Sequence, residues 1–210
     1  MRITWRIIAL FILLILSGPA WAQIEEGKVD STSVFYVKPV SGKPSGIFIA
    51  PFLGVDFPLK TFSGNSKNAV TYGARLEFAS MHIYPIVLFG EYQFTKHPGS
   101  DVFKSQYYLS TLETKVSSFG GGFYFLANKY LKSNFTAPFI VGEVKFYNVT
   151  RTVTPDVNIE NLNKSESKVV LSGGLGFTLY IFDIITSYNF AGDYSSLSVK
   201  TQFHFPLIKF

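Results

Sequence analysis

The sequence contains no cysteine among its 210 residues, and its histidines are limited to His82, His97 and His204. The absence of cysteine excludes disulfides, thiolate metal sites and a lipid-modified cysteine at a cleavage point. Three widely spaced histidines offer no ligand spacing, so we predict neither a metal site nor a cofactor. Charged residues make up only 16% of the chain, below the quarter or so that is usual for soluble domains. Beyond the first residues, no apolar run is long enough for a membrane helix.

The N-terminus has the pattern of an export signal. Arg2 and Arg6 lie in the first residues, an apolar run covers 7–16, and the triplet at 20–22 has small residues at its first and third positions. These features predict a secretory signal peptide over residues 1–22, because the run is too short to span roughly 30 Å of hydrocarbon. The remaining 188 residues carry 17 basic and 14 acidic side chains, a net charge of +3. This small and scattered surplus argues against a nucleic-acid partner.

The rest of the chain predicts an all-β protein. Aromatic residues reach 17%, and many Thr, Val and Ile residues favour strands. Residues 23–45 form a polar lead-in, in which 34–37 could be a short extra strand. Period-two alternation then predicts strands at 46–57, 69–79, 82–95, 111–126, 134–150, 167–181, 184–191 and 196–208. Long and short segments between these predicted strands nearly alternate, which is typical of an antiparallel up-and-down transmembrane β-barrel. We predict such a barrel over residues 46–210, with about eight strands; the pattern leaves eight or ten open.

Each predicted strand has one apolar and one polar face. In the second strand, Val70 and Leu76 alternate with Arg75 and Glu77, and side chains two apart share a face. The charged residues assigned to the polar faces form a predicted lumen charge network of Asp56, Arg75, Glu77, Glu91, Glu113, Lys115, Glu143, Lys145 and Lys200. Five acids and four bases suit a closed lumen, because an unpaired buried charge has a large desolvation cost.

Two features of this pattern leave alternatives open. Alternation alone does not distinguish a membrane barrel from a soluble barrel, in which the apolar face would be inside and the charges would be solvated surface pairs. In the fourth strand, Phe119 and Phe123 share parity with Glu113 and Lys115, so either a bulge or a strand running past the membrane is needed there.

The last residues carry a resemblance. The segment from Phe203 to Phe210 alternates in part and ends the protein on an aromatic residue. Together with the export signal and the alternating strands, it resembles the bacterial outer-membrane β-barrel superfamily with its small OmpA- and OmpX-type members. The resemblance implies a monomer in the outer-membrane lipids of a Gram-negative cell, with Phe210 as the signal for the assembly machinery. His204 and Pro206 break the apolar alternation of such a signal, and a bulge near Pro206 would account for the shift.

An eight-stranded barrel has an interior that side chains can fill. We therefore expect a non-enzymatic barrel with a structural or interaction role through loops 58–68, 96–110 and 151–166, where specificity would lie. His204 is expected to form hydrogen bonds in the lumen.

Two other functions stay open. One is a membrane-embedded hydrolase resembling lipid A deacylases, which place a serine two residues after the catalytic histidine. Here Tyr84, Gly99 and Pro206 occupy those places. The other is a soluble periplasmic lipocalin-like barrel that holds an apolar ligand.

Overall fold

The computed structural model describes residues 45–127, 136–157, 159, 162–179 and 182–209. The predicted signal peptide, the lead-in up to residue 44 with its short strand, and Phe210 lie outside these described residues. In the described part, no helix is long and apolar enough to cross a membrane.

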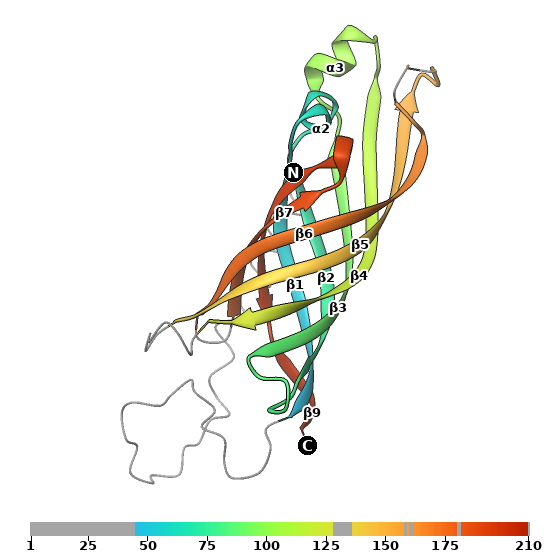
Figure 1. Ribbon diagram of the computed structural model, residues 1–210. Helices are drawn as coiled ribbons and strands as arrows, with labels where there is room; N and C mark the ends of the chain where they lie inside the picture. The colour runs from blue at the N-terminus through green and yellow to red at the C-terminus, as the bar shows by residue number, and fades with distance from the viewer. Residues whose placement is uncertain (1–44, 128–135, 158, 160–161, 180–181, 210) are drawn as a thin grey trace, which may run out of the picture. The chain divides into compact units, whose positions relative to one another are not determined.

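The described residues form one antiparallel sheet with short helices between some of its strands (Figure 1). The strands are β1 (Gly46–Pro58), β2 (Ala69–Ala79), β3 (Ile86–Pro98), β4 (Thr111–Leu126), β5 (Thr136–Thr154), β6 (Ser165–Leu179), β7 (Phe182–Phe190), β8 (Ser196–Phe203) and β9 (Phe205–Lys209). The helical segments are α2 (Thr61–Asn65), α3 (Asp101–Gln106) and the 3-10 turn η1 (Gly192–Tyr194).

The sheet closes on itself. Consecutive strands pair from β1 to β8, and β1 pairs with both β2 and β8, so the first and last strands meet. β9 continues the eighth strand along the other half of β1. The result is an eight-stranded up-and-down barrel, which confirms the predicted fold class. Closure leaves no sheet edge of unpaired N–H and C=O groups, a requirement for strands within hydrocarbon.

Several strand bounds differ from those predicted. β3 begins at Ile86 rather than at residue 82, because residues 80–85 form a turn held by the hydrogen bonds Ile83 N to Ser80 O and Ile86 N to Ile83 O. β3 and β5 also extend to Pro98 and Thr154, so two of the predicted loops are shorter than expected.

The last strand is interrupted at His204, which separates β8 from β9. The register of β9 on β1 shifts between Ile47, which pairs with Ile208, and Phe48, which pairs with Pro206, so that Leu207 is the extra residue. Proline has no N–H to donate and is accommodated at such irregularities. This irregularity is the physical reason for the change of apolar parity near Pro206.

The loops at the end of the barrel that carries α2 and α3 are held to one another. Lys67 N donates to Pro98 O at 2.8 Å, and Ser100 N donates to Asn65 O at 3.0 Å. An apolar cluster joins the α3 loop to the loop before β6: Leu109, Leu112, Ile159 and Leu162. These loops therefore present a defined surface, and Figure 1 shows α2 and α3 at the end of the barrel away from the C-terminus.

An exposed ion-pair cluster adds to this loop contact. Hydrogen bonds from Lys67 and Lys104 lower the pKa of the Asp101 carboxyl to about 2. A carboxyl group whose pKa is lowered in the folded state stabilises the fold. This stabilisation is fully present above the ordinary Asp pKa of about 4 and is lost as the pH falls toward 2. We expect Lys67→Met to raise the pKa of Asp101 toward its ordinary value in a carboxyl NMR titration. Lys115→Met should leave this pKa unchanged, and an equal shift in both variants would contradict the assignment.

Candidate functional site

The outer wall of the barrel is apolar on every strand. Large hydrophobic side chains point outward around the whole closed sheet, with Leu53 54% exposed, Leu76 54%, Tyr92 59% and Leu175 66%. Other exposed members include Phe119, Phe123, Ile140, Phe146, Val169, Leu171, Phe190, Val199, Phe205 and Leu207. A soluble barrel would place this face inside, so the orientation contradicts the lipocalin-like alternative.

The structure places Glu113 and Lys115 outside the lumen, so their assignment to the predicted charge network was wrong. The register between β4 and β5 runs without a shift from Thr111 to Leu126, so both residues stay on the same outward face as Phe119. Their side chains are 22% and 47% exposed, and Glu113 pairs with Lys96 at 2.7 Å near the α3 end. β4 therefore extends beyond the apolar part of the outer wall at its α3 end, and no bulge turns these two charges inward.

The other seven predicted network residues point into the barrel and are buried: Asp56, Arg75, Glu77, Glu91, Glu143, Lys145 and Lys200. Arg75 on β2 is the centre of one group. Its Nε donates to Glu91 Oε2 at 2.5 Å, and its other nitrogens donate to Glu143 and to the hydroxyl of Tyr124. The guanidinium carbon also lies 4.3 Å from the ring centroid of Phe89. One cation thus joins β2, β3, β4 and β5 across the lumen.

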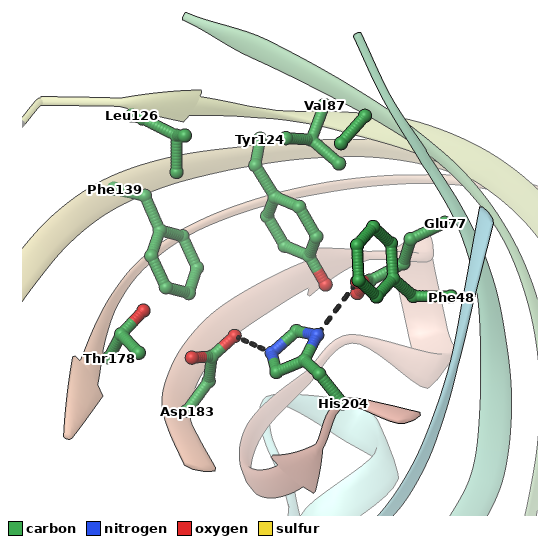
Figure 2. A pocket seen from close by; sticks show the side chains of 10 residues that line it. Phe48, Glu77, Val87, Tyr124, Leu126, Phe139, Thr178, Asp183 and His204 are labelled. Carbon is green, nitrogen blue, oxygen red and sulfur yellow. Dashed lines mark hydrogen bonds and ion pairs between the residues drawn. The ribbon is translucent and has the colours of Figure 1, made fainter. Parts of the chain in front are cut away.

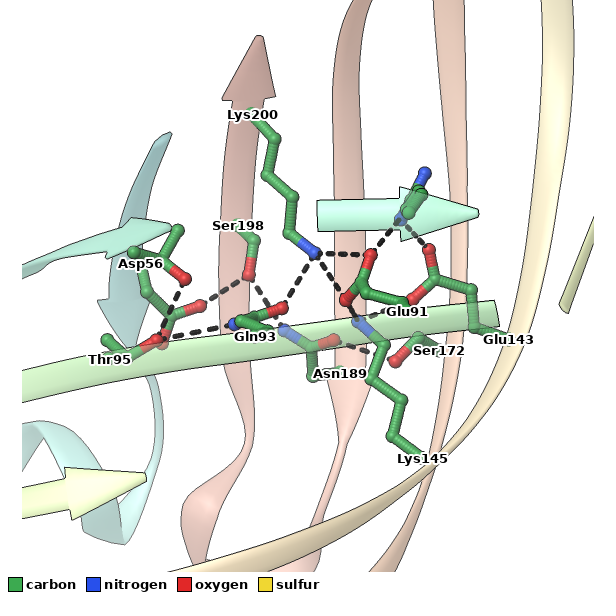
Figure 3. A network of polar contacts seen from close by, with 12 residues as sticks. Asp56, Glu91, Gln93, Thr95, Glu143, Lys145, Ser172, Asn189, Ser198 and Lys200 are labelled. Carbon is green, nitrogen blue, oxygen red and sulfur yellow. Dashed lines mark hydrogen bonds and ion pairs between the residues drawn. The ribbon is translucent and has the colours of Figure 1, made fainter. Parts of the chain in front are cut away.

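Two lysines complete this ionic group (Figure 3). Lys145 Nζ and Lys200 Nζ each lie 3.0 Å from Glu91 Oε1, and Lys145 also pairs with Glu143. Lys200 Nζ donates to Gln93 Oε1 at 2.7 Å. Buried charges are tolerated only when such partners surround them, and here each ion contacts at least one ion of opposite sign.

A second polar group lies nearer the α2 end, around Asp56. Asp56 Oδ1 accepts hydrogen bonds from Ser196, at 3.0 Å, and from Ser198, while Asp56 Oδ2 lies 3.3 Å from His97 Nε2. Asn189 donates to both serines, at 3.0 and 2.9 Å, and accepts from Ser172 at 2.7 Å. These bonds link β1, β3, β6, β7 and β8 through the interior.

Apolar side chains fill the interior on both sides of the polar groups. The cluster toward the loops contains Phe62 of α2 with Val116, Tyr147, Val149, Val170, Ala191 and Tyr194. The cluster toward the other end contains Phe89, Tyr124, Phe139, Val141 and Ile185. Side chains therefore occupy the barrel axis over most of its length.

A third polar group lies around His204, at the end with the short turns (Figure 2). His204 Nδ1 lies 2.8 Å from Glu77 Oε2, and His204 Nε2 lies 2.7 Å from Asp183 Oδ2. Gln202 Nε2 donates to both carboxylates, at 3.1 Å to Glu77 and 3.0 Å to Asp183. Since both ring nitrogens face carboxylates, His204 has no nitrogen free to ligate a metal ion. A cavity of about 200 Å³ lies beside this group.

Several interior residues were not predicted from the sequence, because the predicted strands were too short. Asp183 and His97 lie just outside the predicted seventh and third strands, yet both continue the period-two alternation into the barrel. Asp183, Ser187 and Asn189 alternate with Phe182 and Phe190 along β7. Extending the predicted strand by one residue at its start would have identified Asp183.

The arrangement does not supply a hydrolytic triad among the described residues. No described histidine contacts both a serine hydroxyl and a carboxylate: His204 lies between two acids, and His97 contacts Asp56. The serines near Asp56 donate to the carboxylate, whereas a nucleophile must donate to the histidine. His82 lies 3.4 Å from Ser80 at an exposed turn.

Comparison with known protein families and with curated proteins finds no match. Among solved structures, the chain is similar to the attachment invasion locus protein Ail of Yersinia pestis, in its complex with the heparin analogue sucrose octasulfate. The two sequences are 13% identical, the match covers 78% of this chain and 99% of Ail, and the TM-score is 0.40. Neisserial surface protein A is 10% identical, covering 80% and 99%, with a TM-score of 0.45. The N-terminal β-barrel domain of Pseudomonas aeruginosa OprF is 12% identical, covering 76% and 98%, with a TM-score of 0.40. The chain itself is a closed antiparallel barrel with an apolar outer wall and an ionic interior, which is the arrangement of an outer-membrane barrel.

Proposed function

We propose that this protein is a monomeric, non-enzymatic barrel of the bacterial outer membrane, with a sealed lumen and an interaction role through its loops. The orientation of the two strand faces carries the proposal. The exposed hydrophobic belt suits hydrocarbon tails, and the buried ions have partners that they would lack in an open, unfilled channel.

The loops at the α2 and α3 end are the proposed interaction surface. They comprise the segments between β1 and β2, β3 and β4, and β5 and β6, which are longer than the turn between β2 and β3. Val102 and Tyr108 are 78% and 90% exposed on this surface. Exposed apolar and aromatic side chains on a fixed loop surface favour contact with a partner. In this proposal, the loops face the cell exterior and the short turns face the periplasm.

The location is tested by expressing the full chain and fractionating the cells. We expect the protein in the outer-membrane fraction, and we expect it to require detergent for extraction. Folded barrels migrate differently from boiled ones on gels, so an unheated sample should show a distinct band that disappears on boiling. Extraction as a soluble periplasmic protein without detergent would contradict the proposal.

The sealed lumen is tested by conductance in planar bilayers. Because ion pairs and two apolar clusters fill the barrel axis, we expect no stable channel openings from the reconstituted protein. A porin measured under the same conditions is the positive control. Reproducible large conductance steps would show that the lumen is open.

Assembly by the outer-membrane machinery through Phe210 is also proposed, on the terminal aromatic residue of the sequence. Deleting Phe210 should reduce the amount of heat-modifiable protein in the membrane, while Phe210→Trp, which keeps a terminal aromatic, should not. Equal amounts of folded protein in both variants would contradict this role.

A further inference from the structure

The proposed structural role does not account for the cavity beside His204. Its walls are largely apolar, and a few polar groups converge on one side (Figure 2). The lining residues are Phe48, Glu77, Ala79, Val87, Tyr124, Leu126, Phe139, Thr178, Asp183 and His204. A largely apolar hollow with a few convergent polar groups is the usual form of a small-molecule site.

Asp183, which lines this cavity, has one buried carboxylate oxygen without a hydrogen-bond partner. Asp183 is only 3% exposed, and its Oδ2 accepts from His204 and Gln202. Its Oδ1 is buried and has no hydrogen-bond partner among the described residues. Figure 2 shows this second oxygen directed away from His204, on the side of Thr178. A buried carboxylate oxygen without a donor is costly, so the position favours a ligand that donates a hydrogen bond.

The charge of the cavity is also unbalanced. Glu77 and Asp183 supply two carboxylates, while His204 between them supplies at most one positive charge. Arg75 does not compensate, because it pairs with Glu91 and Glu143 deeper in the barrel. A cationic donor would therefore match both the free oxygen and the excess negative charge.

We propose that this cavity binds a small organic cation, namely a protonated primary amine that carries a compact apolar group. The ammonium donates to Asp183 Oδ1, and the apolar group packs among Phe48, Leu126 and Phe139. A cavity of about 150 Å³ accommodates benzene, so the observed volume of about 200 Å³ is large enough for one aromatic ring with an aminomethyl substituent. This binding goes beyond the proposed structural and loop-mediated role and does not depend on it.

The test uses the full protein, purified in detergent, with three probes of similar shape: benzylammonium, benzyl alcohol and benzoate. Binding is followed by calorimetry and by the NMR shift of the Ala79 methyl group, which lines the cavity. We expect benzylammonium to bind at one site at least tenfold more tightly than benzyl alcohol, and benzoate not to bind. Equal binding of the cationic and neutral probes, or no shift of Ala79 with benzylammonium, would overturn the proposal.

Three variants test whether the binding of benzylammonium depends on the Asp183 carboxylate. Asp183→Asn should weaken benzylammonium binding at least tenfold and leave benzyl alcohol binding within about twofold. Asp156→Asn, an equivalent change at a loop carboxylate that is 74% exposed, should change neither. Ala79→Phe keeps Asp183 but fills the cavity, so it should abolish binding of both probes. Unchanged benzylammonium affinity in Asp183→Asn would overturn the proposal, and the probe comparison on the unaltered protein decides the question even where a variant does not fold.

Discussion

Replacing Arg75 with methionine should lower the free energy of unfolding by about 3–5 kcal/mol. Methionine retains most of the side-chain volume but removes the cation that joins Glu91 and Glu143. Both carboxylates are buried. Without Arg75, Glu143 retains only Lys145 as a cationic partner and Glu91 retains the two lysines, so less of the desolvation cost of the two carboxylates is compensated in a poorly hydrated interior. The measurement is a urea titration of the barrel in lipid vesicles, followed by tyrosine fluorescence and by the heat-modifiable band.

The matched control is Lys96→Met. Lys96 pairs with Glu113 at 2.7 Å, but its side chain is 55% exposed, and exposed pairs contribute about 0–1 kcal/mol. Adding Glu143→Gln to Arg75→Met should recover part of the loss, because it removes the carboxylate that then has Lys145 as its one remaining cationic partner among the described ion pairs. A loss in Arg75→Met no larger than that in Lys96→Met would show that the lumen ions are solvated.

The second large effect is expected on the outer wall, where Leu175→Arg should destabilise the barrel in a bilayer by about 2–4 kcal/mol. Leu175 is 66% exposed and pairs with Thr186, the middle residue of the nine-residue strand β7. Because β7 is so short, its middle must lie close to the midplane of the membrane. A charged side chain there cannot be hydrated without disturbing the lipid. Unfolding in lipid vesicles measures this cost directly.

Val102→Arg provides the comparison, since Val102 is 78% exposed on α3 among the loops. A surface substitution in water changes stability by about 0.5 kcal/mol or less. If Leu175→Arg were as mild as Val102→Arg, the apolar belt would face water, and the membrane assignment would fail.

The sequence was sufficient to predict the barrel because each strand repeats a two-residue pattern over its own length. The predicted bounds 69–79 and 111–126 agree with β2 and β4. The same pattern places Arg75 and Leu76 on opposite faces of the sheet. It did not decide which face is inside, because a soluble barrel has the same alternation, and the structure shows Arg75 buried and Leu76 exposed. The error at Glu113 and Lys115 arose from assigning charged residues by type rather than by parity with Phe119.

The pairing of the interior ions could not be predicted from alternation. Arg75 lies next to Glu77 in the sequence pattern, yet it binds Glu143, which is 68 residues away. Which residues meet across a barrel depends on the tilt and stagger of its strands, and these depend on the summed register of all pairs. The cavity was unpredictable for the same reason, since Glu77, Asp183 and His204 come from β2, β7 and the break between β8 and β9.

The cross-lumen ion pairs have a consequence for how the protein can vary. Arg75 on β2 pairs with Glu91 on β3 and Glu143 on β5, and Lys200 on β8 pairs with Glu91. These ion pairs connect the strands through the interior, in addition to the segments that join them along the chain. Natural variants can therefore exchange residues on the outer loops, and so change what the protein contacts, while the same internal ion pairs keep the wall intact.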